Sequence, residues 1–209
     1  MHGRRGFLNN PAMSQLQHTY LTEDDLANEG FARLGKNVRI APSCNIVGAQ
    51  NISIGDNVRI DGFCTIAAAI GSVTIGSWVH IGGYCALLAS EGIVFEDFSG
   101  LAWGVHIYTR SDDYSGRFMT NPTVPAKFTN PSHGPVHLGR HVIVGAHTVI
   151  LPGVTLGEGG AVGALSLVTK SQPAWTICSG VPARRISERS KDLLKLEDEL
   201  RREAKRDGD

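Results

Sequence analysis

The side chains best suited to proton transfer near neutral pH are the eight histidines of the sequence, because neutral imidazole has an ordinary pKa close to neutrality. A second candidate group is the adjacent pair Asp112 and Asp113, which a tyrosine and a serine follow. Such a group is suited to binding the hydroxyls of a sugar or to orienting a protonated imidazole. A surface position is the plain alternative for each histidine, and an aspartate-rich turn is the plain alternative for the pair.

The elements that position these side chains are set by a repeat of six residues. Between Val136 and Val168, every sixth residue from Leu138 is aliphatic, and the residue two before it is small or β-branched. Neither a helical period nor simple strand alternation gives this spacing, whereas a short strand and a turn, repeated, do. Strand side chains alternate, so both residues point inward. The count gives six coils of three hexads, with the inward aliphatic residues Leu34, Ile40, Ile46, Ile54, Ile60, Ile66, Ile75, Ile81, Leu87, Phe95, Leu101, Ile107, Leu138, Val144, Ile150, Leu156, Val162 and Val168.

The repeat divides the chain into three parts. Residues 1–33 are expected to form a tail and a short helix, capped by Thr22, that covers the first coil. Residues 34–180 carry the repeat, interrupted by an inserted loop at 108–137. A loop of that length in a compact fold is usually functional. Residues 181–209 have a helical stripe of leucines amid charge, which predicts a terminal amphipathic helix on the coils or on a neighbouring subunit.

Composition narrows the function classes. The 20 basic residues balance the 20 acidic ones, and no basic stretch is interleaved with aromatics, so no nucleic-acid partner is expected. No apolar run reaches membrane length. The first residues lack the apolar core of a signal peptide, which favours a cytoplasmic protein. Met13 is a plausible natural start, so the sequence leaves open whether residues 1–12 are native.

The four cysteines are expected to be structural. Cys44, Cys64 and Cys85 each lie two residues before the third aliphatic residue of a coil, so they should stack in one inward column that Val105 continues. A small buried residue is wanted there, and a free cysteine serves as one. The spacing therefore argues against a disulfide or a metal site, although Cys178 falls outside the column.

Several motifs carry a family resemblance. The hexads, the run Ile150-Leu-Pro-Gly-Val-Thr-Leu-Gly, and the stretches Ser166-Leu-Val-Thr-Lys and Gly180-Val-Pro-Ala-Arg-Arg resemble the hexapeptide-repeat acyltransferases, in particular the maltose and galactoside O-acetyltransferase branch. The resemblance covers about Leu34 to Arg185. It implies an all-β, left-handed parallel β-helix that forms a homotrimer with active sites between subunits. It also implies acetyl-CoA as the acyl donor.

The resemblance also implies which residues bind the donor. Carried over by motif, the pantetheine and thioester should meet Ala146 and Ala164, while Thr169, Lys170 and Arg184 should approach the nucleotide end. CoA carries several phosphate charges, which lysine and arginine match. Ordinary solvated charge is the alternative for the two cations.

The catalytic residue is harder to assign. Acetyl transfer to an alcohol needs a base. In the maltose and galactoside enzymes that base is a histidine early in the loop, but its position falls on Asp112, and an aspartate with an ordinary pKa of about 3.9 is a weak base. We therefore expect His80 to be the base, because it precedes an inward residue and points outward from a coil, with His147, beside Ala146, as second choice.

The sequence thus predicts an acetyl-CoA-dependent acetyltransferase acting on a sugar hydroxyl, in surface polysaccharide or glycoside metabolism. Acetylation of a nucleotide-linked amino sugar is the alternative, because an amine needs no strong base. A γ-class carbonic anhydrase would need three converging histidines, but His137, His141 and His147 differ in hexad phase. The long insertion and the CoA motifs argue against a non-catalytic scaffold. No residue in the insertion identifies the acceptor sugar.

Overall fold

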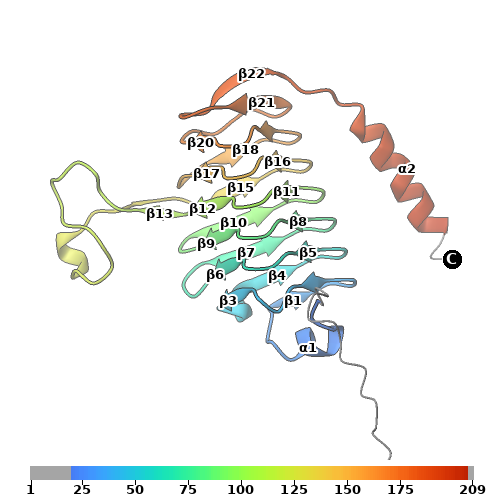
Figure 1. Cartoon of the computed structure of the whole chain (residues 1–209), viewed down its shortest axis with the longest axis horizontal. Helices are drawn as coiled ribbons and strands as arrows, with labels where there is room; N and C mark the ends of the chain where they lie inside the picture. The colour runs from blue at the N-terminus through green and yellow to red at the C-terminus, as the bar shows by residue number, and fades with distance from the viewer. Residues whose placement is uncertain (1–19, 207–209) are drawn as a thin grey trace, which may run out of the picture.

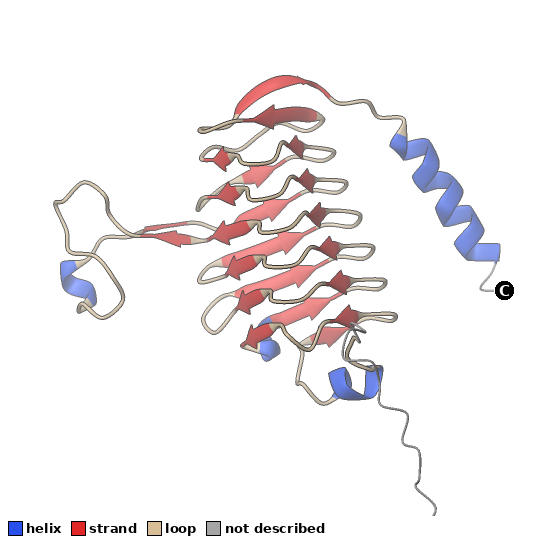
Figure 2. Ribbon diagram, in the orientation of Figure 1, coloured by secondary structure: helices blue, strands red, loops and turns tan. Residues whose placement is uncertain are grey.

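Three parallel β-sheets form the sides of a triangular column in the computed structural model, which describes residues 20–206 (Figure 1). Sheet A contains β1 (Arg33–Leu34), β4 (Ile52–Ile54), β7 (Ser72–Ile75), β10 (Gly92–Phe95), β15 (Val136–Leu138) and β18 (Thr155–Leu156). Sheet B contains β2 (Arg39–Ile40), β5 (Arg59–Ile60), β8 (His80–Ile81), β11 (Gly100–Leu101), β16 (Ile143–Val144), β19 (Ala161–Val162), β21 (Thr176–Ser179) and β22 (Arg184–Glu188). Sheet C contains β3 (Asn45–Val47), β6 (Thr65–Ala67), β9 (Ala86–Leu88), β12 (His106–Tyr108), β17 (Val149–Ile150) and β20 (Leu167–Val168). Each coil contributes one strand to each sheet, so the predicted six coils of a parallel β-helix are confirmed (Figure 2).

The predicted hexad residues form the core. Ile60, Ile81 and Val144 are all 0 % exposed, and they stack in register on sheet B, with Leu101 of β11 between Ile81 and Val144. Only Leu34 and Ile46, both in the first coil, are partly buried, since no complete coil lies beneath them. The aliphatic positions therefore stabilise the fold by burial of apolar surface along the whole column.

The cysteine column is also confirmed. Cys64 and Cys85 are buried and Cys44 is half-buried, and all are free thiols. Each thiol donates to a backbone carbonyl of the next coil, with Cys44 Sγ 3.1 Å from the oxygen of Asp61 and Cys64 Sγ 3.1 Å from that of Gly82. These thiols therefore serve as small buried donors.

The corners between the sheets force left-handed backbone conformations. Several corner residues other than glycine have positive φ, among them Tyr84 (60°), His141 (61°) and His147 (56°). Such a conformation turns the chain sharply and directs the side chain away from the column. Two of the histidines that could do chemistry are therefore presented at corners, on opposite edges of sheet B.

The insertion forms an arm that projects from the column (Figure 1). The arm begins with the antiparallel pair β13 (Arg110–Ser111) and β14 (Ser132–His133), and it contains the 3-10 helix η2 (Ala126–Phe128). Tyr108 still belongs to β12 and Val136 already opens β15, so the arm is slightly shorter than the predicted 108–137. A second 3-10 turn, η1 (Ala49–Asn51), fills one of the corner excesses.

Helices lie at both ends of the described chain. The short helix α1 (Glu23–Ala27) has the predicted Thr22 cap, which forms a capping box with Asp25, and it buries Leu26 under the first coil. The helix α2 (Leu193–Arg206) starts later than the leucine stripe suggests, because residues 184–188 form β22 and pair antiparallel with β21. Within residues 20–206 no helix has the length and hydropathy needed to cross a membrane. Residues 1–12 lie outside the described residues.

Candidate active site

The two alanines expected to meet the thioester lie together at the corner between sheets B and C. Ala146 precedes β17 and Ala164 precedes β20, and the carbonyl oxygen of Ala146 accepts the N–H of Leu165 at 2.8 Å. A Cβ on Gly145 would lie only 2.4 Å from the nitrogen of Ala164, so the coils stack closely here. The two alanines are therefore held at the same corner on successive coils.

The expected nucleotide-end residues lie at the same end of the column. Thr169 and Lys170 are exposed directly after β20, at the corner where sheet C ends. Arg184 is exposed at the start of β22, and its guanidinium donates to the carbonyl oxygen of Ala183 at 2.9 Å. The predicted donor residues thus flank the last strands of sheet C, from one corner to the other.

His147 directly follows Ala146 at the corner between sheets B and C, and its imidazole has no hydrogen-bond partner among the described residues. It is exposed at the corner, and its imidazole covers Gly104 of the coil below, since a Cβ there would be 2.6 Å from Nδ1. Neither ring nitrogen makes a hydrogen bond or an ion pair with any residue in the part of the chain that the structure describes. The imidazole can therefore exchange a proton with a ligand.

His80 is bound to other side chains of its own chain. Its Nε2 lies 2.8 Å from Oδ2 of Asp61 and 2.9 Å from a guanidinium nitrogen of Arg59, and Asp61 also accepts the Tyr20 hydroxyl at 2.9 Å. Burial raises the pKa of Asp61, but the hydrogen bonds from His80 and Tyr20 outweigh it, so this pKa is lowered overall. His80 belongs to sheet B, and within one chain the structure does not bring it together with the donor residues of sheet C.

The histidines differ in how they are paired. Of the six in residues 20–206, four contact a carboxylate, in the pairs His80–Asp61 (2.8 Å), His133–Glu91 (2.9 Å), His137–Glu96 (2.9 Å) and His141–Glu197 (2.7 Å). The other two, His106 and His147, have no such partner among the described residues, and both lie on or beside sheet C. Across the same residues, no three histidine, cysteine or acidic side chains are grouped to hold a metal ion.

Asp112 and Asp113 lie where the arm leaves the column. The Asp112 carboxylate accepts the backbone N–H of Asn121 at 3.1 Å, and that of Asp113 accepts the Ser115 hydroxyl at 2.7 Å. The hydrogen bond from Ser115 lowers the pKa of Asp113. Figure 1 shows the arm on the side of sheet C, opposite to the side of β8. The arm that carries the two acids follows β12 of sheet C, whereas His80 belongs to β8 of sheet B.

An apolar groove lies elsewhere, between sheet B and α2. It encloses about 740 Å³, and its wall includes Phe98, Ile143 and Leu196, with Asp61 and His80 at one side. None of the residues assigned to CoA lines it. The groove and the residues expected to bind the donor are thus different features.

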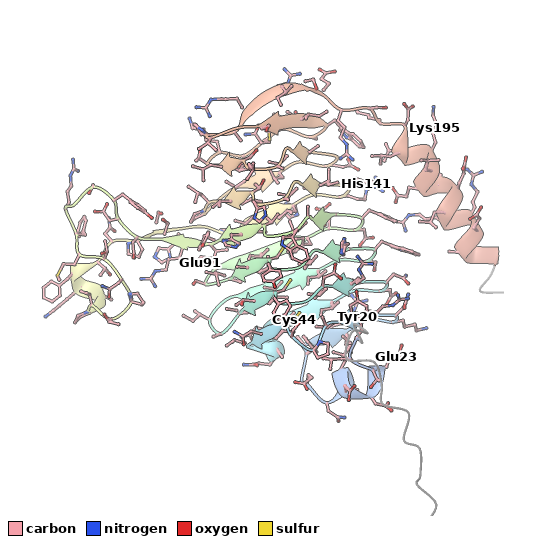
Figure 3. All side chains as sticks on the ribbon, in the orientation of Figure 1. Tyr20, Glu23, Cys44, Glu91, His141 and Lys195 are labelled. Atoms are coloured by element: carbon pink, nitrogen blue, oxygen red, sulfur yellow. The ribbon has the colours of Figure 1, made fainter. Side chains whose placement is uncertain are left out.

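A buried acid that the sequence reasoning missed holds α2 at this groove. Glu197 accepts hydrogen bonds from Arg140 (2.8 Å), His141 (2.7 Å) and Arg201 (2.7 Å). Figure 3 shows His141 on the side of the column that faces α2. Arg140 and His141 lie 57 and 56 residues from Glu197 in sequence, so no local pattern could have revealed these two partners.

An aromatic ladder, also missed, runs along the His147 corner. The rings of Phe63 and Tyr84 are 4.8 Å apart, as are those of Tyr84 and Trp103, and all three are about half exposed. A signal was present, since Phe63 and Tyr84 each precede a cysteine of the inward column. The ladder provides apolar contact area on the coils below Ala146 and Ala164, the residues expected to meet the thioester.

Known proteins resemble this chain over most of its length. No protein-family model matches it. It is 42% identical over 178 residues to the dTDP-4-amino-4,6-dideoxy-D-glucose acyltransferase of Escherichia coli, a match that covers 85% of this chain and 93% of that protein. The galactoside O-acetyltransferase of E. coli K12 matches a shorter segment, 46% identical over 54 residues, which is 26% of this chain and 27% of that enzyme.

Solved structures agree. AntD, an N-acyltransferase from Bacillus cereus solved in complex with dTDP and 3-hydroxybutyryl-CoA, superposes with a TM-score of 0.87 and 40% identity, covering 90% of this chain and 100% of that one. A maltose O-acetyltransferase from Clostridium difficile 630 has a TM-score of 0.54 and 24% identity, over 80% and 75% of the two chains, so that likeness concerns the fold alone. With its six confirmed coils, the chain belongs to the hexapeptide-repeat acyltransferase family.

Proposed function

We propose that this protein transfers an acyl group from a CoA thioester to the amino group of a dTDP-linked amino sugar. The observation that carries the proposal is the match, over most of the chain, to an enzyme named for dTDP-4-amino-4,6-dideoxy-D-glucose and to an N-acyltransferase that binds dTDP and an acyl-CoA. The expected O-acetylation of a sugar hydroxyl has weaker support, because the O-acetyltransferases match a short segment or the fold alone. The sequence alternative, N-acetylation, therefore becomes the main proposal.

The chemistry of an amine explains the aspartate at the loop position. A neutral amine attacks the thioester carbonyl with its lone pair, so no base is needed to create the nucleophile. The C–N bond forms, the C–S bond breaks, and CoA leaves as a thiol once the proton of the ammonium nitrogen reaches the sulfur. The substrate's ammonium form must first lose one proton to solvent, and the Asp112 and Asp113 carboxylates can then accept hydrogen bonds from the N–H groups of the neutral amine and orient it.

The proton acceptor in this scheme is His147. Its ring nitrogens are free within residues 20–206, and it neighbours Ala146, where the thioester is expected. It would take the proton from the ammonium intermediate and return it to the CoA sulfur. Because His147 precedes β17 and Asp112 follows β13, at opposite ends of sheet C, the two groups would serve one substrate from neighbouring subunits. Ala146 and Ala164 would contact the pantetheine, and Thr169, Lys170 and Arg184 would contact the nucleotide end of acetyl-CoA.

A homotrimer is part of the proposal. The groove on sheet B has a floor of small residues, Gly82, Gly100 and Ala102, which lets another chain approach closely. A neighbouring copy seated there would let His80 face the site of another subunit. Ile143→Asp tests this idea, because the side chain is 51% exposed in one chain and the fold should tolerate the change. Light scattering should show dissociation; a variant with unchanged mass would count against this interface.

The decisive experiment is an acceptor comparison with acetyl-CoA. We expect thiol release with dTDP-4-amino-4,6-dideoxyglucose and none with maltose, and mass spectrometry should find one added acetyl group in a product that resists mild alkali, as an amide does and an ester does not. Asp112→Asn should lower kcat/KM for the amino sugar about 10- to 100-fold, the effect of losing one charge-assisted contact. Activity with hydroxyl sugars alone would refute the proposal.

A further inference from the structure

We propose that the aromatic ladder of Phe63, Tyr84 and Trp103 binds the acyl chain of the donor, so that the protein selects CoA thioesters whose acyl group is apolar and longer than acetyl. The inference rests on the proposed function for the use of an acyl-CoA, and it adds the class of acyl group that the site accepts. The ladder lies on the line that the expected donor residues define.

Three of the residues expected to bind the donor follow one corner of the column, where sheet B meets sheet C. Arg184, at the nucleotide end, pairs with Ser179, which lies against Gly163, next to Ala164. Ala146 lies one coil further from that end, joined to the Ala164 corner by a backbone hydrogen bond of 2.8 Å. CoA would therefore enter from the end of the column that carries β22, with its thioester at Ala146.

The aromatic ladder continues this line on the next coils. The N–H of His147 donates to the carbonyl oxygen of Trp103 at 2.9 Å, so the ladder begins one coil below Ala146. The rings of Trp103 and Tyr84 are 4.8 Å apart, and so are those of Tyr84 and Phe63. Neighbouring strands are about 4.8 Å apart, so each coil adds one ring in register. An acyl chain that extends from the thioester, away from the pantetheine, would cross one ring after another.

The rings are open to a ligand. Each residue of the ladder is at least 48% exposed, so no element within residues 20–206 shields the ladder from solvent. A similar stack at the corner between sheets A and B, Trp78 on Phe98 at 6.0 Å, is partly covered by α2, whose Arg201 guanidinium lies 5.2 Å from the Phe98 ring. Contiguous exposed apolar surface is typical of a binding site, and the ladder has no such cover of its own.

The chemistry of the ladder favours a hydrocarbon chain. Its three rings offer flat apolar surface and few hydrogen-bonding groups, since phenylalanine has none and an indole has a single N–H donor. A diphosphate or a sugar hydroxyl would lack partners there. An acetyl group would end beside His147, whereas each further methylene would cover part of a ring and leave water.

The proposed assembly would enclose the chain. Trp103 also lines the groove on sheet B, where a neighbouring copy is proposed to sit. The acyl chain would then lie between the ladder and that copy, which increases the apolar area it loses to water. The copy itself is the alternative occupant of the ladder, and the mass of the assembly distinguishes the two.

Calorimetric titration of the full-length protein with CoA, acetyl-CoA, butyryl-CoA and hexanoyl-CoA, without acceptor, tests the assignment. Affinity should rise from acetyl-CoA to hexanoyl-CoA by about 2- to 4-fold for each added methylene. Trp103→Ala and Tyr84→Ala should each weaken hexanoyl-CoA binding about 10-fold and leave the binding of CoA itself unchanged. Tyr84→Phe keeps the ring and should keep the dependence on chain length.

The matched control is Trp78→Ala, because Trp78 is an exposed tryptophan of a stacked pair at the other corner of sheet B. This variant should keep the wild-type dependence on chain length. In transfer to the dTDP-linked amino sugar, kcat/KM should follow the same order of donors.

The assignment is wrong if affinity is equal for all acyl groups, if it falls with chain length, or if the ladder variants behave like Trp78→Ala. It is also wrong if the ladder variants dissociate in light scattering while their preference among donors stays that of the wild type, because the ladder would then be a subunit contact. A wild-type protein that shows the dependence on chain length but acylates no dTDP-linked amino sugar would overturn the proposed acceptor and support the ladder.

Discussion

Replacement of Gly104 by alanine tests the role of His147 without touching the histidine itself. The Cβ added at Gly104 would lie 2.6 Å from Nδ1 of His147 and 2.8 Å from its Cε1. To withdraw from 2.6 Å to the 3.4 Å of an ordinary contact, the ring must move by about 0.8 Å. A misplacement of about 1 Å in a reacting group can cost roughly 10²-fold in rate, so Gly104→Ala should lower kcat by about that factor.

The same substitution also strains the backbone, and a second glycine separates the two effects. Gly104 has a φ of +69°, and an alanine in this left-handed region costs about 1–2 kcal/mol. In a chain of this size that corresponds to a Tm lower by about 2–8 °C. Gly153 has a φ of +77° with nothing within 4 Å of the added Cβ, so Gly153→Ala carries the strain without the collision.

The assay is steady-state acyl transfer to the dTDP amino sugar, with a thermal melt of each variant. We expect both alanine variants to lose similar stability and only Gly104→Ala to lose turnover. His147→Ala sets the scale, because loss of a group that transfers the proton typically costs ~10²–10⁴. Equal kcat values for the two glycine variants, or normal turnover in His147→Ala, would refute the assignment of His147.

Three other predictions follow from the same structure. His80→Ala should leave CoA and dTDP binding unchanged and reduce turnover only in the assembled trimer; a turnover loss in a monomeric variant would show that His80 acts within its own chain. Burial raises the pKa of Glu197, but hydrogen bonds from Arg201 and His141 outweigh it and hold this pKa below the ordinary 4.5. The docking of α2 should therefore persist above about pH 5 and be lost as the pH falls through the lowered pKa of Glu197. Glu197→Gln should loosen α2 at neutral pH, which hydrogen exchange of the α2 amides would show. Equal protection of α2 at acidic and neutral pH would contradict this prediction. Cys64 and Cys178 are buried, which blocks access of reagents to their thiols. Cys44 lowers the pKa of Cys64, but the Cys85 thiol and burial outweigh this effect and raise that pKa to about 12. The native protein should therefore react slowly with thiol reagents and give a low background in the CoA-release assay, and fast labelling would contradict the inward cysteine column.

The column could be predicted because its determinant is local and periodic. Ile60, Ile81 and Val144 are fully buried where the six-residue count places them, since each coil repeats the same inward and outward alternation. The strand at 184–188 could not be predicted in this way. Every residue of β22 is exposed, so it has no apolar pattern, and its pairing depends on the edge that β21 offers.

The site could be predicted only in part, for a related reason. Ala146 and Ala164 stack as expected because the repeat brings corresponding corner positions together. The hydrogen bond between His80 and Asp61 depends on side-chain conformations, so the repeat alone could not predict it. The stacking of Arg59 under His80 does follow from the repeat. Partners of Glu197 were beyond reach, because the position of α2 is a tertiary property that no local spacing encodes.

The distribution of acids and imidazoles over the faces separates the two acceptor chemistries. A hydroxyl must lose its proton as it attacks, so it needs a base that is free and fixed next to it. His80, whose imidazole contacts the Asp61 carboxylate, lies on sheet B, away from the donor residues. An amine, once neutral, needs only carboxylates that accept its N–H groups and orient it, and an acceptor for one proton after attack. Sheet C has the unpaired His147 at the corner before β17, and Asp112 and Asp113 in the arm that follows β12; these groups suit an amine better than an alcohol.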